Sequence, residues 1–573
     1  MTDFTTCLVR DSKLSQITDK QIFAVQQGAS NNTFQQFQAV SATSSSLVFN
    51  IQVPSQSIVV NREVAIRATD FSFSLKIAGA TAGQTAFNLG STDSLAPFPL
   101  TMCMNTISSQ LNNTNVSETI SDILPQLLRM NDSRELYRWN GGAPTLPDQS
   151  YLNYSDGVLA NNNSLGAYEN ASYDLDQVPR GAFPCKSCSV TQFTSAGSPV
   201  STLTPNVIVT TGNYLVVQLV YDLIEPIFLS PFIFSNPQYN LGGLVGINTL
   251  NLVAQLNTGS RLWRTANSAY TYTLSYGTTS STTGLPISTN PFQGQVEMLM
   301  NFLSTQSTDL IPSRSVVPYM SYPRYLTTAT TSLANGASGS ITSANLQLNS
   351  IPDKFIIVVR KPYSSLTSSD SDSWFPINSV QISLNNQSGL LSSATNFDLW
   401  RLSVEAGSSQ SYPEFLGSAT QSGNNGEGNI VATTGSLLVL SPAQSLSLPA
   451  MLSSGSIGQF NFQITLNVTN PYDVAITPEI VIITANAGIM VNQAGSSAVY
   501  TGILTRQMVV DTATGSNVPA VEVPEYNRMV GGKIGNAGAY KGMLASKTHR
   551  PSILGAPIVS MPVGMKSGVS KYI

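Results

Sequence analysis

The sequence is poor in charge, in histidine and in cysteine, and each shortage disfavours a class of protein. Charged residues make up 10% of the 573 residues, against about 25% in an ordinary soluble protein. Only His549 is available to a Ser-His or Cys-His arrangement, and it sits in a basic tail, which disfavours hydrolases of that kind. Four cysteines in this length do not make a disulfide framework.

Long apolar runs are missing as well. No run reaches the roughly 18 residues that a membrane-spanning helix needs, and the amino-terminal stretch MTDFTTCLVRDSKLSQ lacks the basic and apolar regions of a signal peptide. We therefore expect a protein that does not follow the conventional secretory route. So few charges also give little repulsion between copies, which favours a surface that copies of the chain cover.

Motifs for metal or phosphate binding are incomplete. Cys185 and Cys188, in CKSC, resemble half of a zinc site whose other half is missing, so plain thiols or one local disulfide are the better interpretation. The glycine-rich GGKIGNAG lacks the spacing of a phosphate-binding loop. We predict no cofactor and no bound metal.

One pair of acids deserves comparison with glycosidase sites. Two carboxylates can hydrolyse a glycosidic bond, and Asp370 and Asp372 lie close together in SSDSDSW. Among so many serines, we interpret them as part of a solvated loop. The sequence therefore predicts no catalytic residue and no enzyme.

Alternating apolar residues dominate the chain and predict β-structure with one buried face per strand. In QFNFQITLNVT the apolar positions alternate without error from Phe460 to Val468. The other predicted strands lie in SSLVFNIQVPSQ, REVAIRATDFSFSLKI, YLVVQLVYDLIEP, GINTLNLVAQLN, KFIIVVRK and GSLLVLS.

One short pattern occurs twice. MNTISSQLNN begins at Met104 and INSVQISLNN begins at Ile377, about half the chain apart. Each copy reads as a strand followed by an Asn-Asn turn. We predict that Asn112 and Asn385 occupy equivalent places in two related halves.

A helix is expected after each copy. In VSETISDILPQLLRM the apolar residues recur at helical spacing, with Ser117 as the predicted cap and Glu118 and Asp122 near the positive helix end. Because Pro125 is interior, we expect a kink or a helix in two pieces. SSATNFDLWRLSV, after the second copy, is the weaker candidate.

Weakly patterned segments divide the chain. Residues 1–40 suit an extended arm, 131–205 and 258–290 suit long loops, and the proline-punctuated segment from Thr305 suits a connection between halves. The predicted units are 1–40, 41–300, 301–525 and 526–573.

The last unit differs in charge from the rest. From Tyr526 to the end there are seven basic residues and no acid. Such a tail suits a solvated end, an arm that meets nucleic acid or a membrane surface, or a segment that is removed. Its cations are too sparse for a strong nucleic-acid footprint, and we predict no sequence-specific binding.

Several segments together resemble a known family. They are VFNIQVPSQSIVVNREVAI, FPLTMCMNTISSQLNNTNVSETISDILPQLLRM, EPIFLSPF, GLVGINTLNLVAQLN and RLWR. In this order the sequence resembles the double jelly-roll major capsid proteins of polinton-like viruses and virophages, of the adenovirus-like capsid lineage. The second half is similar in kind only, through its FPIN and LNN run and its alternating strands.

The resemblance implies an all-β fold of two antiparallel eight-stranded jelly rolls in tandem, with short helices and long loops. It implies a homotrimer that forms a pseudo-hexameric capsomer, and capsomers that tile an icosahedral shell around double-stranded DNA. Neighbouring capsomers, penton and other minor capsid proteins are the implied partners, and the virion is the implied location.

The resemblance also bears on the tail. Such viruses often encode a maturation cysteine protease that cuts after a motif matched here by Met529, Val530, Gly531 and Gly532. A cut after Gly532 releases a basic segment that we expect to face the capsid interior. Its cations are Lys533, Lys541, Lys547, Arg550, Lys566 and Lys571.

Two other functions remain open on the sequence alone. One is a β-sandwich adhesin or fibre that binds glycans through its long loops. The other is a carbohydrate-active enzyme on a jelly-roll scaffold. A trimer with a hexagonal outline favours the capsid interpretation over both.

Overall fold

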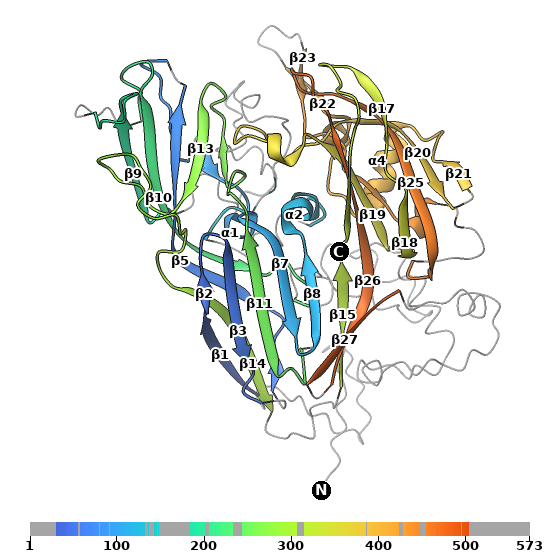
Figure 1. Ribbon diagram of the computed structural model, residues 1–573. Helices are drawn as coiled ribbons and strands as arrows, with labels where there is room; N and C mark the ends of the chain where they lie inside the picture. Colours follow the sequence, from blue (N-terminus) through green and yellow to red (C-terminus); the bar gives the residue numbers. More distant parts are fainter. Residues whose placement is uncertain are drawn as a thin grey trace, which may run out of the picture.

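In the computed structural model, two β-rich halves lie side by side (Figure 1). The structure describes residues 30–55, 58–79, 81–90, 92–131, 136, 142–145, 147, 184–200, 206–232, 243–305, 314–385, 387–422, 428–446, 448, 454–493 and 495–502. None of the helices in these ranges is long and apolar enough to cross a membrane.

The first half contains two antiparallel sheets and a small two-stranded one. One sheet has the order β1-β14-β5-β10-β9, with β13 beside β5 and β4 beside β14, and the other has the order β2-β3-β11-β7-β8. The strands are β1 (Ser30–Gln38), β2 (Ser41–Ala42), β3 (Ser46–Gln52), β4 (Val59–Val60), β5 (Ala65–Ala78), β6 (Asp93–Leu95), β7 (Met104–Leu111), β8 (Thr114–Glu118), β9 (Ser187–Phe193), β10 (Tyr214–Pro226), β11 (Thr249–Leu256), β12 (Trp263–Thr265), β13 (Thr271–Tyr276) and β14 (Val296–Thr305).

The second half repeats this plan. One sheet has the order β15-β26-β19-β24, with β16 and β27 also beside β26, and the other has the order β17-β25-β20-β21, with β18 beside β25. The strands are β15 (Ser315–Ser321), β16 (Arg324–Thr328), β17 (Ser338–Thr342), β18 (Leu346–Ser350), β19 (Lys354–Arg360), β20 (Ile377–Leu384), β21 (Gln387–Leu390), β22 (Ser418–Ser422), β23 (Gly428–Ala432), β24 (Leu438–Leu440), β25 (Ile457–Thr469), β26 (Glu479–Gln493) and β27 (Ser496–Thr501).

The order of the strands makes each half a jelly roll. In the first half the principal strands β1, β3, β5, β7, β8, β10, β11 and β14 divide into two four-stranded sheets in which the first strand pairs with the last and the second with the seventh. In the second half β15 with β16, β17 with β18, β19, β20, β21, β24, β25 and β26 take the same eight places. We call these the first roll (β1 to β14) and the second roll (β15 to β27). The predicted fold is confirmed.

The predicted strands appear where the alternation placed them, and one departure from alternation has a structural cause. In β5 the buried side chains switch phase between Ile66 and Phe71. Asp70, between them, has a left-handed backbone (φ 52°), and the pairing of β5 with β10 shifts register at Tyr221 and Leu223. A bulge therefore keeps apolar residues on the core side along one long strand.

Two strands of the second roll are buried on both faces. In β26, Ile480 and Ile482 belong to the second roll's own core, whereas Val481 and Ile483 belong to the cluster that contains the first roll's core. Ile356 of β19 also joins that cluster, while its neighbour Ile357 faces the second core. The outer face of this sheet is thus packed against the first roll, which explains the nearly unbroken apolar letters of KFIIVVRK.

The helix α2 (Ile120–Leu128) lies between the two rolls (Figure 1). It is a single helix with Pro125 inside; of the two expected outcomes, a kink or a helix in two pieces, the second does not occur. Its cap is Thr119, whereas the predicted cap, Ser117, lies in β8 because that strand continues to Glu118. The other short helices of the described residues are α1 (Pro99–Met102), η6 (Tyr363–Ser365), α4 (Asn396–Glu405), α5 (Tyr412–Leu416) and α6 (Pro442–Ser445).

Several segments expected to be irregular contain strands. Residues 30–38 of the predicted arm form β1, which pairs along its whole length with β14. β9, β12 and β13 lie within the predicted loops, and β15 lies within the predicted connection. β1 and β9 escaped prediction because polar residues dominate them, and pairing with the longer strands β14 and β10 holds them.

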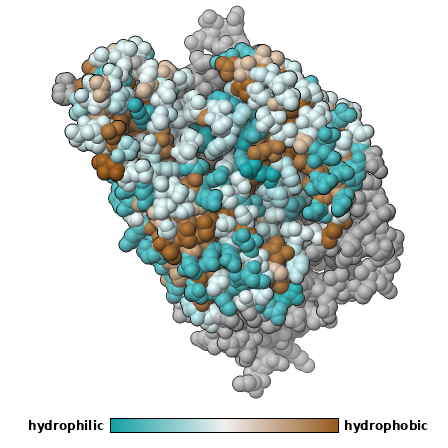
Figure 2. Space-filling model, viewed as in Figure 1, coloured by the Kyte–Doolittle hydropathy of each residue, from teal (hydrophilic) through white to brown (hydrophobic). Residues whose placement is uncertain are grey.

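The exposed surface agrees with the charge-poor composition. Figure 2 shows a face that is mostly pale or teal, with apolar residues in small separate patches. Large apolar side chains that are well exposed include Phe34 and Phe397.

Candidate functional site at the junction of the two rolls

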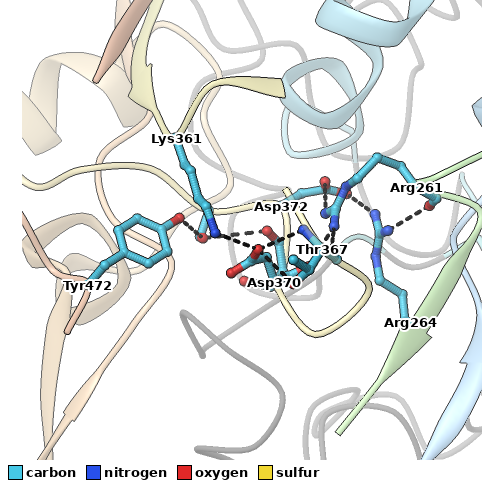
Figure 3. Close-up of polar contacts among 9 residues, drawn as sticks. Arg261, Arg264, Lys361, Thr367, Asp370, Asp372 and Tyr472 are labelled. Carbon is cyan, nitrogen blue, oxygen red and sulfur yellow. Dashed lines mark hydrogen bonds and ion pairs between the residues drawn. The ribbon is translucent and has the colours of Figure 1, made fainter. Parts of the chain in front are cut away.

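A cluster of buried charges joins the RLWR segment of the first roll to the loop after β19 (Figure 3). Asp372 receives Arg261 Nη2 on Oδ1 and Arg264 Nη2 on Oδ2, each at 2.8 Å. The two arginine side chains are 1% and 0% exposed, and that of Asp372 is 11% exposed. Arg261 Nη1 also donates to the carbonyl oxygen of Asp370 at 2.9 Å.

Asp370 completes this cluster on the side away from the arginines (Figure 3). Its Oδ2 accepts from Thr367 N at 2.8 Å and from Lys361 Nζ at 3.0 Å. The predicted solvated loop is therefore wrong: Asp370 is buried, and Asp372 is almost so. Each carboxylate already has a cationic partner, so the arrangement neutralises charge within an interface.

A second cluster is centred on α2. Asp122 Oδ1 accepts from Arg360 Nη2 of β19 at 2.6 Å, and its Oδ2 lies 2.7 Å from Nε of Arg324 in β16. Arg360 Nε donates in turn to Glu479 of β26 at 3.0 Å. The predicted acid near the positive end of the helix is present, and its main role is to bind two arginines of the other roll.

The last turn of α2 makes a third contact with the second roll. The carbonyl oxygen of Arg129 accepts from Ser409 N at 3.0 Å. Its guanidinium lies over the ring of Trp374, 5.0 Å from the centroid, and 3.9 Å from Glu414. Cation–π contact is a common way to bury an arginine.

The two repeated turns have the same local structure. Asn112 and Asn385 follow the equivalent strands β7 and β20 and have left-handed backbones, with φ 52° and 51°. Asn112 Oδ1 accepts from Asn248 N, just before β11, at 2.8 Å. Asn385 Oδ1 accepts from Asn461 N of β25, also at 2.8 Å. The predicted equivalence of the two asparagines is confirmed at the level of the turn.

Their surroundings differ. Asn112 Nδ2 donates to Ser497 Oγ of β27 at 3.0 Å, and Ser497 N donates to Asn113 Oδ1 at 2.8 Å. Asn385 is exposed instead. The turn of the first roll is thus part of the junction, whereas its counterpart in the second roll faces solvent.

Glu118 contributes a titratable group to the junction. It ends β8, and its Oε1 accepts from Tyr322 N, between β15 and β16, at 2.9 Å. Burial raises the pKa of Glu118 to about 7, against the opposing effect of that N–H group. Its negative charge at neutral pH is consequently a cost to the folded chain.

Other residues named from the sequence lie apart from the junction or outside the described part of the chain. Cys185 lies just before β9 and Cys188 lies within it, and both are free thiols. Among the described residues no group of three or more metal-binding side chains occurs. Met529 to Gly532, the basic tail and His549 lie outside the described residues.

Sequence reasoning missed the junction arginines. RLWR was noted only as a family resemblance, without a role. One signal was available: in a chain with few charges, a pair of arginines and a pair of aspartates are each conspicuous. Their separation by more than a hundred residues left no local pattern to connect them.

The architecture defines a class. Two jelly rolls in tandem within one chain are the architecture of double jelly-roll capsid proteins. Comparisons with known proteins give the same class.

The profile of the Sputnik virophage major capsid protein first domain matches residues 2–303, and that of the major capsid protein V20 C-terminal domain matches residues 322–488. The putative capsid protein V20 of Sputnik virophage is 27% identical over 566 residues, covering 94% of this chain and 89% of that protein.

Solved structures show the same fold. A chain in the cryo-EM structure of the Sputnik virophage has a TM-score of 0.71 at 23% identity, covering 92% of this chain and 98% of that chain. The mavirus major capsid protein has a TM-score of 0.64 at 14% identity, covering 89% and 98%.

The chain belongs to the Sputnik virophage major capsid protein family. It is a capsid-forming protein, and its location is the capsid of the virion. Its relatives are structural proteins, which implies a non-enzymatic role. Neither the adhesin nor the carbohydrate-active enzyme gains support from these comparisons.

Proposed function

We propose that three copies of this chain form a pseudo-hexameric capsomer, and that such capsomers tile the icosahedral shell of a double-stranded DNA virus. The observation that carries the proposal is the repeated topology: one chain supplies two rolls with the same strand order. Three chains then supply six similar rolls, which a ring with near-sixfold symmetry requires.

The geometry of the junction supports a ring. The first roll contributes α2 and the β7–β8 turn, whereas the second roll contributes the outer face of β19 and β26. Different surfaces therefore meet, and a contact between different surfaces leaves one of each kind open for the next copy. Such contacts generate closed rings when the rotation closes.

The proposal is tested by the mass and the outline of the purified full-length chain. Native mass spectrometry should give a species of three chains of 61.0 kDa, and negative-stain images should show a hexagonal outline. A chain that stays monomeric at every concentration tested, and that binds glycans on an array, would overturn the proposal in favour of the adhesin. Capsomer contacts with penton and other minor capsid proteins belong to the same proposal.

Strand pairing supports a revised division of the chain. β1 pairs with β14, so the first unit begins no later than Ser30 rather than at 41. β15 pairs with β26, so the second unit includes Ser315 onward. The predicted boundary near residue 300 thus moves to between β14 and β15.

We further propose that a viral maturation protease cuts the chain after Gly532. The motif from Met529 to Gly532 precedes a segment whose only charges are positive, and such a segment suits the interior of a shell that holds DNA. Intact mass of the protein from virions should show the loss of residues 533–573. A G532V variant should retain them, and a full-length 61.0 kDa chain in wild-type virions would contradict the cut.

A further inference from the structure

The surface that α2 occupies on the second roll has a counterpart on the first roll. In the second roll, Arg360 of β19 is in register with Glu479 of β26, and its Nε donates to Glu479 Oε2 at 3.0 Å. In the first roll, Arg67 of β5 is in register with Glu297 of β14, and its Nε donates to Glu297 Oε2 at 2.9 Å. The two pairs join equivalent strands and have the same bonding.

The two arginines differ in what covers them. Arg360, 7% exposed, uses Nη2 to bind Asp122 of α2. Arg67 is 30% exposed, and its Nη2 reaches Gln36 Oε1 at an exposed position in addition to Glu297. The first roll therefore carries a similar arginine that lacks the cover of a helix among the described residues.

The surrounding sheet face is open in the same way. Val481 and Ile483, which follow Glu479 on the outer face of β26, are fully buried against the first roll. Leu299 and Asn301 take the corresponding places after Glu297 and are only half-buried. Arg324 of β16 pairs with Ile483, and Phe34 of β1 pairs with Asn301, so Phe34 takes the place of Arg324 on the first roll. Phe34 is 54% exposed.

The helix that binds the second roll also has a counterpart. α2 and α4 each follow the fifth strand of a roll, each begins after a threonine cap, and each has an aspartate at its third position, Asp122 and Asp398. Asp122 is buried in the junction, whereas Asp398 is exposed. The capping hydrogen bonds that Asp398 accepts from Thr395 both go to Oδ2, at 3.0 Å and 2.7 Å.

The exposed side of α4 is aromatic. Phe397, next to Asp398, is 49% exposed, and its ring lies 5.4 Å from Trp400 and 5.3 Å from Tyr412. Partly exposed aromatic clusters are frequent at the centres of protein interfaces. Arg401, one turn along the helix, is paired with Glu405 at 3.3 Å, so the charge left to meet a partner is that of Asp398.

We propose that α4 of one chain docks on the outer face of the first roll of a second copy, so that Asp398 pairs with Arg67 of that copy and Phe397 packs near Phe34. Within one chain, α2 of the first roll contacts the outer sheet face of the second roll. The equivalent contact, between α4 of a second roll and the outer sheet face of a first roll, must therefore join two copies. Charge and apolar area match in this arrangement: acid meets base, and an exposed aromatic side chain meets another. The inference rests on the proposed ring and assigns its contact residues.

A charge reversal tests the contact. D398R places two arginines together and should weaken association between copies by about tenfold or more. D398R also removes the capping-box hydrogen bonds between Thr395 and the Asp398 carboxylate, so the matched control is T395A, which removes the hydroxyl partner and keeps the carboxylate. T395A should assemble as the wild type does. The double variant R67E/D398R restores opposite charges at the contact and should recover association.

A second readout does not depend on the reversal being tolerated. In R67C/D398C, made in a C185S/C188S background because those thiols are free, a short bismaleimide should join copies into dimers and trimers on a denaturing gel, whereas R67C or D398C alone should not. A linker is used because the two ends of an arginine–aspartate contact are too far apart for a direct disulfide. If wild type is a trimer, but D398R assembles normally and the cysteine pair does not cross-link, the contact is refuted and the ring stands. If wild type itself is a monomer, the proposed function fails first.

Discussion

Asp372 is the carboxylate that joins Arg261 and Arg264 at the junction of the two rolls. It faces two arginines whose side chains are 1% and 0% exposed, and it is the carboxylate that binds both. D372N keeps the volume of the side chain and removes the charge. Arg261 retains the carbonyl oxygen of Asp370 and Arg264 retains that of Arg261, but both buried cations lose the charge of this carboxylate.

Removing one partner of a buried ion pair costs about 3–5 kcal/mol, because the other charge stays desolvated. We expect D372N to lower the free energy of unfolding by that amount. The matched control is E405Q, which removes an exposed pair with Arg401, 65% and 49% exposed, and should change the free energy by about 0.5 kcal/mol or less.

Guanidinium denaturation followed by tryptophan fluorescence is the assay, since Trp263 and Trp374 are buried beside the two sides of this cluster. The loss of unfolding free energy in D372N should persist in high salt, because salt screens buried ion pairs poorly. A D372N chain that unfolds within about 1 kcal/mol of the wild type, with an unchanged denaturant slope, would refute the reasoning.

Two further predictions concern the carboxyl of Glu118 and the turn at Asn112. Because burial raises the pKa of Glu118 to about 7 and that of Glu225 similarly, the folded chain binds more protons than the unfolded chain between about pH 4.5 and 7, and stability should fall as pH rises through that window. E118Q should reduce this slope and be more stable than wild type at pH 8, as thermal unfolding across pH will show; an unchanged slope would contradict the assignment. N112G keeps the left-handed turn but loses the hydrogen bonds to Asn248 and Ser497, so it should cost about 2 kcal/mol. N385G loses one exposed bond and should cost less than about 1 kcal/mol in the same denaturation assay; equal losses would show that the junction adds nothing to the turn.

Local pattern was enough to predict the β-class and many of the strands. Apolar residues alternate from Phe460 to Val468 because one face of β25 is buried. The two LNN turns indicate a duplicated element, because a left-handed residue after a strand favours asparagine. α4 was predicted from weak periodicity, and its only buried residues are Leu399 and Ser403.

The errors have a common physical cause. β1 and β9 are polar strands that a longer neighbour holds through backbone pairing, and backbone hydrogen bonds leave no mark in the side-chain sequence. Asp370 and Asp372 lie among serines, as a solvated loop does; only the approach of Arg261 and Arg264 makes their burial favourable.

The sequence by itself determined the β-class and the repetition of one strand-and-turn element in two halves, since apolar periodicity and turn residues act over a few neighbouring positions. The jelly-roll topology was expected from the family resemblance. The tertiary structure alone decided how the rolls meet. The pairs Asp122 with Arg360, and Asp372 with Arg261 and Arg264, join residues far apart in the chain. Coulomb attraction between buried groups depends on distance in space and on the exclusion of water, neither of which the order of residues records.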